Sequence, residues 1–303
     1  MDNSYECFSD KYKLITKIGS GSFGEVYLTY DNNNNKFATK IEEKKNTSRL
    51  KEEYEIYRKL RKNGIKTGIP KVSAYIETSK SNMMVMQILG KSLDTLLSEN
   101  NGIFELNTTL KLSIDIVKLL KNIHNAGFVH RDIKPNNFLV GYENKCDELY
   151  IMDFGLSKQY INEHKHMNMR VERSLIGTAR YASINVHMGI EPSRRDDLES
   201  VGYMLIYFLK GKLPWQGLKK KKGDDLIKLI GDTKMYTNIK KLCENIPECF
   251  YEYIQYCRKL KFNEDPDYDY LIKLFTDYAI NNNINLYYCW SSQIGLNNQS
   301  LTS

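Results

Sequence analysis

Apolar and polar residues alternate over residues 12–18, which is typical of a β-strand with one buried face. Turns rich in glycine and asparagine and a Gly-Ile-Pro turn separate the strands expected after it, so that strands are predicted at residues 12–18, 25–30, 36–41, 71–77 and 82–87. Residues 48–63 differ, because their apolar side chains recur at helical spacing before Gly64. One helix is therefore expected between the third and the fourth strand.

Beyond residue 90 the apolar spacing becomes helical. The clearest helices predicted from this spacing are residues 92–99, 108–124 and about 195–210. We therefore expect an α+β fold with a small β-rich N-lobe at about 12–88 and a larger α-helical C-lobe at about 89–290. Residues 291–303 are expected to form a short polar tail.

Composition narrows the class of protein. With 303 residues and 41% hydrophobic content, the chain can bury a large core. Its six cysteines are scattered and include no C-x-x-C pair, which favours reduced thiols over a zinc site. The first ten residues are polar and acidic, unlike a secretory signal, and the longest apolar run, 201–209, is too short to cross a membrane.

The net charge of +7 comes partly from one run of four lysines at 219–222. No aromatic residues are interleaved with this run, so a solvated basic turn is favoured over direct nucleic-acid binding. We expect a monomer that binds neither nucleic acid nor membrane and lies in the cytoplasm, with the nucleus as the alternative.

The stretch with the most specific chemistry reads HRDIKPNNFLV and then LYIMDFG. Asp132 can align a hydroxyl and accept its proton, while Lys134 offsets charge on a transferring phosphate. Asn137 and Asp153 supply an amide and a carboxylate of the kind that hold Mg²⁺. Phosphoryl transfer needs this set of groups.

Two features of the first lobe support the same chemistry. The string GSGSFGEVY places glycines between two predicted strands, where backbone amides can approach phosphates; before a helix, the same spacing would indicate a dinucleotide fold. Lys40 lies in the third predicted strand, and three glutamates of the following helix could pair with it. Glu53 shares the apolar face of that helix, whereas Glu52 and Glu55 point outward, so we predict the Lys40–Glu53 pair.

The two strings resemble the H-R-D-x-x-x-x-N catalytic loop and the D-F-G metal loop of protein kinases, and the lysine at 134 is typical of serine/threonine kinases. The resemblance implies a bilobal protein-kinase fold at 12–290, with ATP and Mg²⁺ between the lobes. Asp132, Lys134, Lys40 and Glu53 would be catalytic, and Asn137 and Asp153 would hold the metal. The residues that would surround ATP are Ile18, Gly19, Ser20, Gly21, Ser22, Phe23, Gly24, Val26, Ala38, Lys40, Met86, Gln87, Leu89 and Leu139.

Residues 177–215, which begin GTARYASIN, are similar to the casein kinase 1 family, and the resemblance extends over about 12–290. Most kinases have the string A-P-E at the end of this segment, and its Glu pairs with a distant arginine. Here Ser183-Ile184-Asn185 replaces A-P-E and Asp269 replaces that arginine, so both partners are altered. Asp197 matches the buried Asp that holds the catalytic loop; the alternative is an exposed acid that caps a helix, a role we assign to Asp196.

The casein kinase 1 resemblance also implies a substrate class, namely protein hydroxyls that follow acidic or phosphorylated residues. Thr178 would lie near the substrate hydroxyl, and the cations of one anion pocket would be Arg131, Lys158 and Arg173. A second pocket would use Arg180 and Gly217, but Leu226 replaces its lysine, for which the lysine run is the candidate to compensate.

Two rival functions remain to be weighed. A pseudokinase scaffold would lack at least one of Lys40, Asp132, Asn137 and Asp153, and all four are present. A kinase-fold enzyme for small molecules is disfavoured by the intact GTARYASIN segment.

Overall fold

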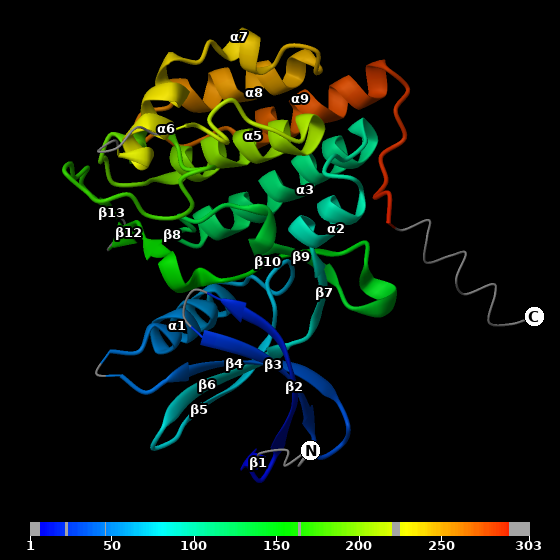
Figure 1. The fold of residues 1–303 in the computed structure, drawn as a ribbon, viewed down its shortest axis with the longest axis vertical. Coiled ribbons are helices and arrows are strands. Elements are labelled where there is room, and N and C mark those ends of the chain that lie inside the picture. The colour runs from blue at the N-terminus through cyan, green and yellow to red at the C-terminus, as the bar shows by residue number, and fades with distance from the viewer. Residues whose placement is uncertain (1–6, 22–23, 46, 163–164, 220–224, 291–303) are drawn as a thin grey trace, which may run out of the picture. The chain divides into compact units, whose positions relative to one another are not determined.

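The computed structural model describes residues 7–21, 24–45, 47–162, 165–219 and 225–290 (Figure 1). The chain divides into two compact units. Unit 1 comprises the described residues of Met1–Lys91 and Leu139–Gly155, and unit 2 those of Ser92–Phe138 and Leu156–Ser303. The loop that carries Asp153 thus belongs to the same unit as the first strands.

Unit 1 is built on a six-stranded sheet in the order β1-β2-β3-β4-β6-β5, in which all neighbours are antiparallel. The strands are β1 (Cys7–Ser9), β2 (Tyr12–Gly21), β3 (Gly24–Asp31), β4 (Lys36–Glu43), β5 (Val72–Glu77) and β6 (Ser81–Gln87). A smaller sheet has the order β10-β9-β7, with β7 at Leu89–Ser92, β9 at Phe138–Gly141 and β10 at Leu149–Ile151. All five strands predicted in the first ninety residues are therefore confirmed.

The helix of unit 1, α1 (Arg49–Lys62), packs against β5 and β6. It begins at Ser48, whose hydroxyl accepts a hydrogen bond from the backbone N–H of Lys51 at 3.1 Å and so caps the first turn. Its buried residues are Leu50, Glu53, Tyr57 and Leu60. One carboxylate thus lies on an otherwise apolar face.

Unit 2 is mainly helical. Its helices are α2 (Leu93–Glu99), α3 (Leu106–Asn125), α4 (Ile184–His187), α5 (Arg194–Lys210), α6 (Leu226–Tyr236), α7 (Ile239–Leu242), α8 (Glu248–Lys259) and α9 (Tyr268–Asn281). Its short strands are β8 (Phe128–Val129), β11 (Lys158–Gln159), β12 (Ile161–Asn162) and β13 (Lys165–His166). The short 3₁₀ helices of the chain are η1 (Pro135–Asn137), η2 (Glu143–Lys145) and η3 (Phe154–Leu156).

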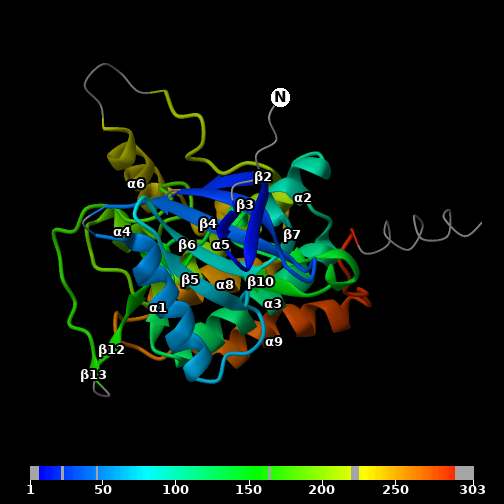
Figure 2. The ribbon, with the colours of Figure 1, turned by 90° about the horizontal axis from the view of Figure 1, so that it is seen from below.

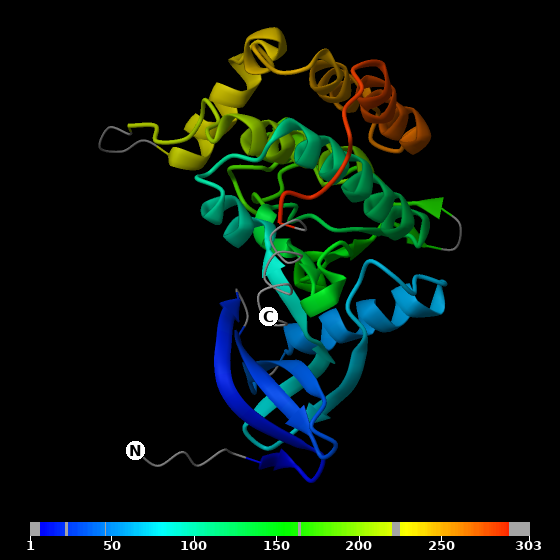
Figure 3. The ribbon, with the colours of Figure 1, turned by 90° about the vertical axis from the view of Figure 1, so that its right-hand side faces the viewer.

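The core of unit 2 is formed by four long helices. Helix α5 packs against α3 and α8, and α9 packs against α3 and α8 (Figures 1 and 3). The residues of α5 from Asp196 to Ile206 are all buried, which explains their long apolar run. On another side of this unit α4 lies beside α6 (Figure 2).

The sheet of unit 1 and the helices of unit 2 confirm the predicted α+β fold class. None of the helices in the described part of the chain is both long enough and apolar enough to span a membrane.

Candidate active site

Lys40 is the centre of a buried ion cluster in unit 1. Its Nζ lies 2.7 Å from Oε2 of Glu53 and 3.0 Å from Oδ1 of Asp153, and only 3% of the residue is exposed. Burial opposes the charge of Lys40, but the two carboxylates outweigh it and raise the pKa of the lysine. The ammonium group is therefore retained at neutral pH, and the predicted Lys40–Glu53 pair is present.

The face of α1 explains why Glu53 is the partner. Glu52 is exposed, and Glu55 binds Arg58 in an exposed pair on the same helix. Glu53 is 1% exposed, one turn before Tyr57. The Tyr57 hydroxyl accepts a hydrogen bond from the backbone N–H of Asp153 at 3.3 Å, so α1 also holds the loop that carries Asp153.

Asp153 has a left-handed backbone, with φ at 65°. Such a conformation costs a non-glycine residue about 1 kcal/mol or more and is tolerated mainly where surrounding contacts enforce it. Next to it, Phe154 is fully buried and packs edge-on against Tyr57 with ring centroids 4.9 Å apart. The loop of Asp153 and Phe154 is therefore fixed by α1 within unit 1.

The predicted ATP-binding residues of unit 1 lie on strands β2, β3, β4, β6, β7 and β9. Strand pairing puts Val26 opposite both Gly19 and Lys40, and Ala38 opposite Met86. The remaining members lie along the same strands: Ile18, Ser20 and Gly21 on β2, Gly24 on β3, Gln87 on β6, Leu89 on β7 and Leu139 on β9. Ser22 and Phe23 lie outside the described residues.

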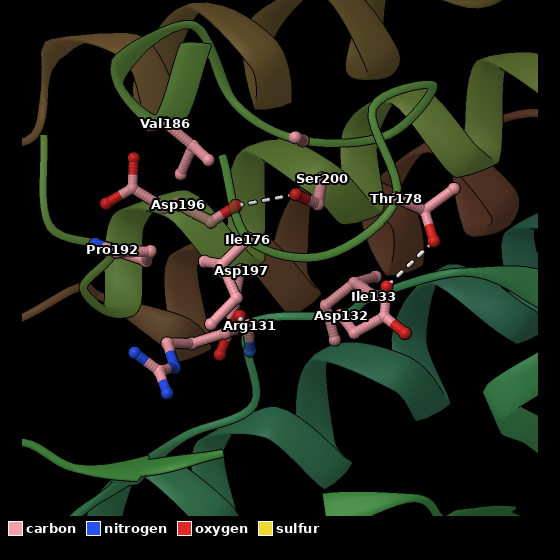
Figure 4. Close-up of a pocket in the computed structure, with 11 residues that line it drawn as sticks. Arg131, Asp132, Ile133, Ile176, Thr178, Val186, Pro192, Asp196, Asp197 and Ser200 are labelled. Atoms are coloured by element: carbon pink, nitrogen blue, oxygen red, sulfur yellow. Dashed lines mark hydrogen bonds between the residues drawn. The ribbon is translucent and has the colours of Figure 1, made fainter. Parts of the chain in front are cut away.

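Several polar groups of unit 2 converge on Asp132, and Figure 4 shows one of them, the hydroxyl of Thr178. Nζ of Lys134 lies 2.5 Å from Oδ2 of Asp132, and the hydroxyl of Thr178 donates to Oδ1 at 2.8 Å. Nδ2 of Asn137 donates to the Asp132 carbonyl at 2.8 Å, which fixes the orientation of the amide. The structure thus brings Asp132, Lys134, Asn137 and Thr178 together.

Close approach of the segment that carries Thr178 depends on a glycine. Gly177 has φ at +82°, and a Cβ on it would lie 2.4 Å from the carbonyl oxygen of Arg131. Any larger residue would push the segment away from the catalytic loop. Gly177, the first residue of the GTAR string, is therefore required for steric reasons.

Asp197, at the start of α5, holds the catalytic loop in place. Its Oδ2 accepts from the backbone N–H of His130 at 2.7 Å, and its Oδ1 accepts from the backbone N–H of Arg131 at 2.8 Å. These bonds fix Arg131 in a left-handed conformation with φ at 69°. The role predicted for Asp197 is therefore present.

His124 completes this cluster. Burial lowers its pKa, so the ring is neutral at pH 7. Since the Asp197 carboxylate only accepts hydrogen bonds, Nε2 of His124 carries the proton and donates across 2.9 Å, while Nδ1 accepts from the hydroxyl of Tyr268 at 2.7 Å. Burial would raise the pKa of Asp197, but the hydrogen bonds it accepts outweigh that effect and lower the pKa.

One prediction near this cluster is wrong. Asp196 does cap α5, through a capping box with Ser193, but it is 2% exposed and not a surface residue. It also accepts from the hydroxyl of Ser183 at 2.6 Å, so it anchors the Ser183-Ile184-Asn185 string. Asp269, which stands where most kinases have the arginine, has an exposed carboxylate that binds Lys121 at 2.7 Å.

The three predicted cations of the first anion pocket converge on a carboxylate that sequence reasoning missed. Glu191 is 2% exposed; its Oε1 lies 2.9 Å from Nζ of Lys158 and 3.3 Å from Nη1 of Arg131, and its Oε2 lies 3.7 Å from Nε of Arg173. The counter-charge that the cations require is thus internal. Its signal in the sequence, one Glu between Ile190 and Pro192, is too weak to assign a role.

A cavity of about 340 Å³ opens beside these cations. Its lining residues are Arg131, Glu172, Arg173, Ser174, Leu175, Ile176, Glu191 and Pro192. One carboxylate among three cations leaves a positive excess next to the cavity, although Glu172 adds a second carboxylate at its wall.

The second predicted pocket is less complete. The guanidinium of Arg180 stacks at 5.8 Å from the ring of Tyr181 and at 5.6 Å from that of Tyr207. Leu226 is 42% exposed at the start of α6. Three of the four lysines proposed to compensate, 220–222, lie outside the described residues.

One comparison with known proteins decides the family. A family model described as a protein kinase domain matches residues 12–266. The chain belongs to the protein kinase domain family. The prediction of a protein kinase and of its fold is therefore confirmed, and a kinase domain implies protein substrates and the general use of ATP and Mg²⁺ in this family.

Proposed function

We propose that this protein kinase is a serine/threonine kinase of the casein kinase 1 type, which transfers the γ-phosphate of ATP to protein hydroxyls. The observation that carries the proposal is the hydroxyl of Thr178 bound to Oδ1 of Asp132, with the Lys134 ammonium on Oδ2. An aliphatic hydroxyl is already accepted at the carboxylate that would take the substrate's proton. A serine or threonine hydroxyl would make the same hydrogen bond.

In the reaction, the substrate oxygen would attack the γ-phosphorus while its proton passes to Asp132, and the bond from phosphorus to the ADP oxygen would break. Lys134 would offset the negative charge on the phosphoryl oxygens. Since one side of the Asp132 carboxylate holds Lys134, the other side is the acceptor for the hydroxyl. The role of Thr178 would be to keep that acceptor oriented until substrate binds.

In the proposal Asn137 and Asp153 would hold Mg²⁺, because the donor atoms of each side chain suit this ion. The amide nitrogen of Asn137 donates to the Asp132 carbonyl, so its oxygen is the atom suited to a cation, and Asp153 adds a carboxylate. Amide and carboxylate oxygens are ligands that Mg²⁺ prefers. When bound, the ion would neutralise charge on the phosphate oxygens.

For the nucleotide, Lys40 would bind phosphate oxygens, with Glu53 holding its ammonium in place. The residues along β2, β3, β4, β6, β7 and β9 that were predicted to surround ATP keep that role in the proposal. A pseudokinase scaffold is not favoured, because Lys40 is paired with the carboxylates of Glu53 and Asp153. In addition, the Asp132 carboxylate is bound by Lys134 and Thr178.

Phosphoryl transfer is tested with Asp132→Asn and Asp153→Asn. Each should abolish transfer of labelled γ-phosphate from ATP to casein, because the first variant loses the proton acceptor and the second loses a metal ligand. Phosphoamino-acid analysis of the wild-type product should give phosphoserine or phosphothreonine. Turnover like that of the wild type in either folded variant, or phosphotyrosine as the main product, would refute the assignment.

Preference for acidic or phospho-primed substrates is the finer part of the proposal. Arg131, Lys158 and Arg173 supply more positive charge than Glu191 neutralises, which suits a phosphate or carboxylate beside the substrate hydroxyl. Arg173→Glu should lower kcat/KM on a phospho-primed peptide at least tenfold and change the KM for ATP little. Lys273→Glu, at an exposed lysine on α9, is the matched control.

Salt gives a second readout for this preference. The loss of kcat/KM on the phospho-primed peptide in Arg173→Glu should become smaller as salt is raised from 0.05 to 0.5 M. The reason is that the Arg173 side chain is 54% exposed, so salt screens its charge. Equal kcat/KM of Arg173→Glu and Lys273→Glu on primed and unprimed peptides would show that the cations are ordinary surface charges.

A further inference from the structure

Lys234 is a fully buried lysine on a helix that is otherwise largely accessible. Gly231 and Lys234 are the two buried residues of α6. Gly231 lies against α4, where a Cβ on it would come within 2.8 Å of the His187 Cβ. Burial of an ammonium group is costly unless specific partners compensate for the lost water, so the partners of Lys234 indicate its purpose.

Two of these partners belong to the segment that carries Thr178, and a third is Nε2 of His187 on α4, 3.3 Å from Nζ of Lys234. Nζ of Lys234 donates to the carbonyl oxygen of Ala179 at 2.7 Å and to that of Ala182 at 2.5 Å. The same ammonium lies 5.0 Å from the ring centre of Tyr203 and 5.1 Å from that of Trp215. Burial lowers the pKa of Lys234 to about 7, while Glu199 and the two aromatic faces favour the charged form.

Two more donors hold the same stretch of backbone. Nε2 of His187 lies 3.1 Å from the carbonyl of Ala179, and Nε1 of Trp215 donates to the carbonyl of Arg180 at 2.7 Å. Carbonyls 179, 180 and 182 are thus all bound from the side of the core. The Thr178 carbonyl in turn accepts from the backbone N–H groups of residues 181 and 182, which closes a tight turn.

This turn leads directly to the reacting carboxylate. Thr178, whose carbonyl closes the turn, donates its hydroxyl to Asp132. A shift of the turn would therefore move both the surface that meets the substrate and the group that orients Asp132. Lys234 is bound to the turn at two carbonyls, at 2.7 and 2.5 Å, whereas Ser183 fixes its far end through Asp196.

We infer that Lys234 is a positioning residue for phosphoryl transfer, which holds residues 178–182 in the conformation that receives the protein substrate. The inference rests on the kinase activity proposed above. It assigns to α6 the anchoring of the substrate segment, which in this chain lacks the A-P-E Glu. Because Lys234 contacts only the backbone of that segment, it should affect the use of protein substrate far more than the use of ATP.

The test compares Lys234→Met with Lys228→Met in the full chain. Methionine has a similar length but no N–H donor, and Lys228 is an exposed lysine on the same helix. Lys234→Met should raise the KM for casein at least tenfold and leave the KM for ATP within twofold, while Lys228→Met should change neither. Lys234→Arg retains N–H donors and should recover part of the loss.

An unchanged KM for casein in folded Lys234→Met would overturn the inference. Parallel changes in both KM values, or an equal effect in Lys228→Met, would also overturn it, because either result indicates a general effect on the unit. If Lys234→Met does not fold, Lys234→Gln, which keeps an N–H donor, replaces it with an expected rise of about threefold by the weaker hydrogen bonding.

Hydrogen exchange separates this inference from the proposed function, because it needs no activity. Amides of residues 178–187 should exchange faster in Lys234→Met or Lys234→Gln than in the wild type, while those of α5 stay unchanged. Equal exchange in wild type and variant would refute the positioning role. Lack of transfer to casein by the wild type would refute the proposed function alone.

Discussion

Asp197→Asn replaces a buried carboxylate by an amide of the same shape. The carboxylate accepts three N–H groups: His130 and His124 at Oδ2, and Arg131 at Oδ1. Asparagine offers one accepting oxygen and one donating nitrogen. Whichever way the amide turns, at least one buried N–H then faces another donor.

The expected cost follows from this count. One buried N–H without an acceptor costs about 1 to 3 kcal/mol, and the remaining bonds lose the strength that a charged acceptor gives them. We therefore expect Asp197→Asn to lower the free energy of unfolding of unit 2 by about 2 to 4 kcal/mol. Asp269→Asn makes the same chemical change at a side chain that is 80% exposed and should cost less than about 1 kcal/mol.

Tryptophan fluorescence during urea unfolding is a suitable assay, because both tryptophans of the chain, Trp215 and Trp290, lie in unit 2. The signal therefore follows that unit even if unit 1 unfolds separately. The Asp197→Asn midpoint should fall well below that of the wild type, with Asp269→Asn close to the wild type. Equal midpoints of the two variants would refute the account of Asp197 as the anchor of the catalytic loop.

Four further outcomes are expected. Gly177→Ala should lower casein phosphorylation at least tenfold without changing ATP affinity, since the new Cβ meets the backbone at 2.4 Å; full activity would contradict the steric reading. Burial lowers the pKa of His187 from 6.5 to about 4, so between these pH values the unfolded chain binds a proton that the folded chain does not. The free energy of unfolding of the wild type should therefore decrease as the pH falls through this range, by about 1 kcal/mol more than that of His187→Gln. The same pH dependence in both proteins, measured by urea unfolding, would refute this. Glu191→Gln should tighten binding of a phosphorylated peptide by removing the internal counter-charge, and weaker binding measured by calorimetry would be contrary evidence. Protein made in bacteria and stripped by phosphatase should still phosphorylate casein, and strict dependence on a phosphate at Ser174 would contradict this.

Local patterns were sufficient for five strands of the main sheet of unit 1, for four helices and for part of the site. The helix predicted at 48–63 extends over Arg49–Lys62, with the two end residues of the prediction, Ser48 and Asn63, as its caps. The choice of Glu53 over its neighbours followed from helical geometry alone, because a carboxylate on an apolar face needs a buried cation. This prediction succeeds because the apolar pattern lies within α1 and the partner cation, Lys40, lies on the strand that precedes this helix in the chain.

The features that sequence reasoning missed depend on contacts between distant elements. Lys234 lies on a helix with polar and apolar residues on most sides, so it resembles an ordinary surface lysine until the rings of Tyr203 and Trp215 are placed around it. Asp196 was misassigned to the surface for the same reason. An acidic residue at the start of a helix can cap the helix whether it is exposed or buried. Only the position of Ser183, which donates to Asp196, shows that this carboxylate is buried.

The buried carboxylate of Glu191 changes what recognition of an acidic group would mean for this protein. Three cations without a partner would repel one another and would stay apart until a ligand arrived. With Glu191 among them, they are gathered before any ligand binds, and an incoming phosphate would compete with the Glu191 carboxylate for them. The affinity for a ligand would then depend on how much more strongly the cations bind the ligand than they bind Glu191. A singly charged carboxylate would gain little binding free energy from this exchange, whereas a doubly charged phosphate would gain more. Discrimination between acidic and phosphorylated partners can thus arise from a residue that contacts neither.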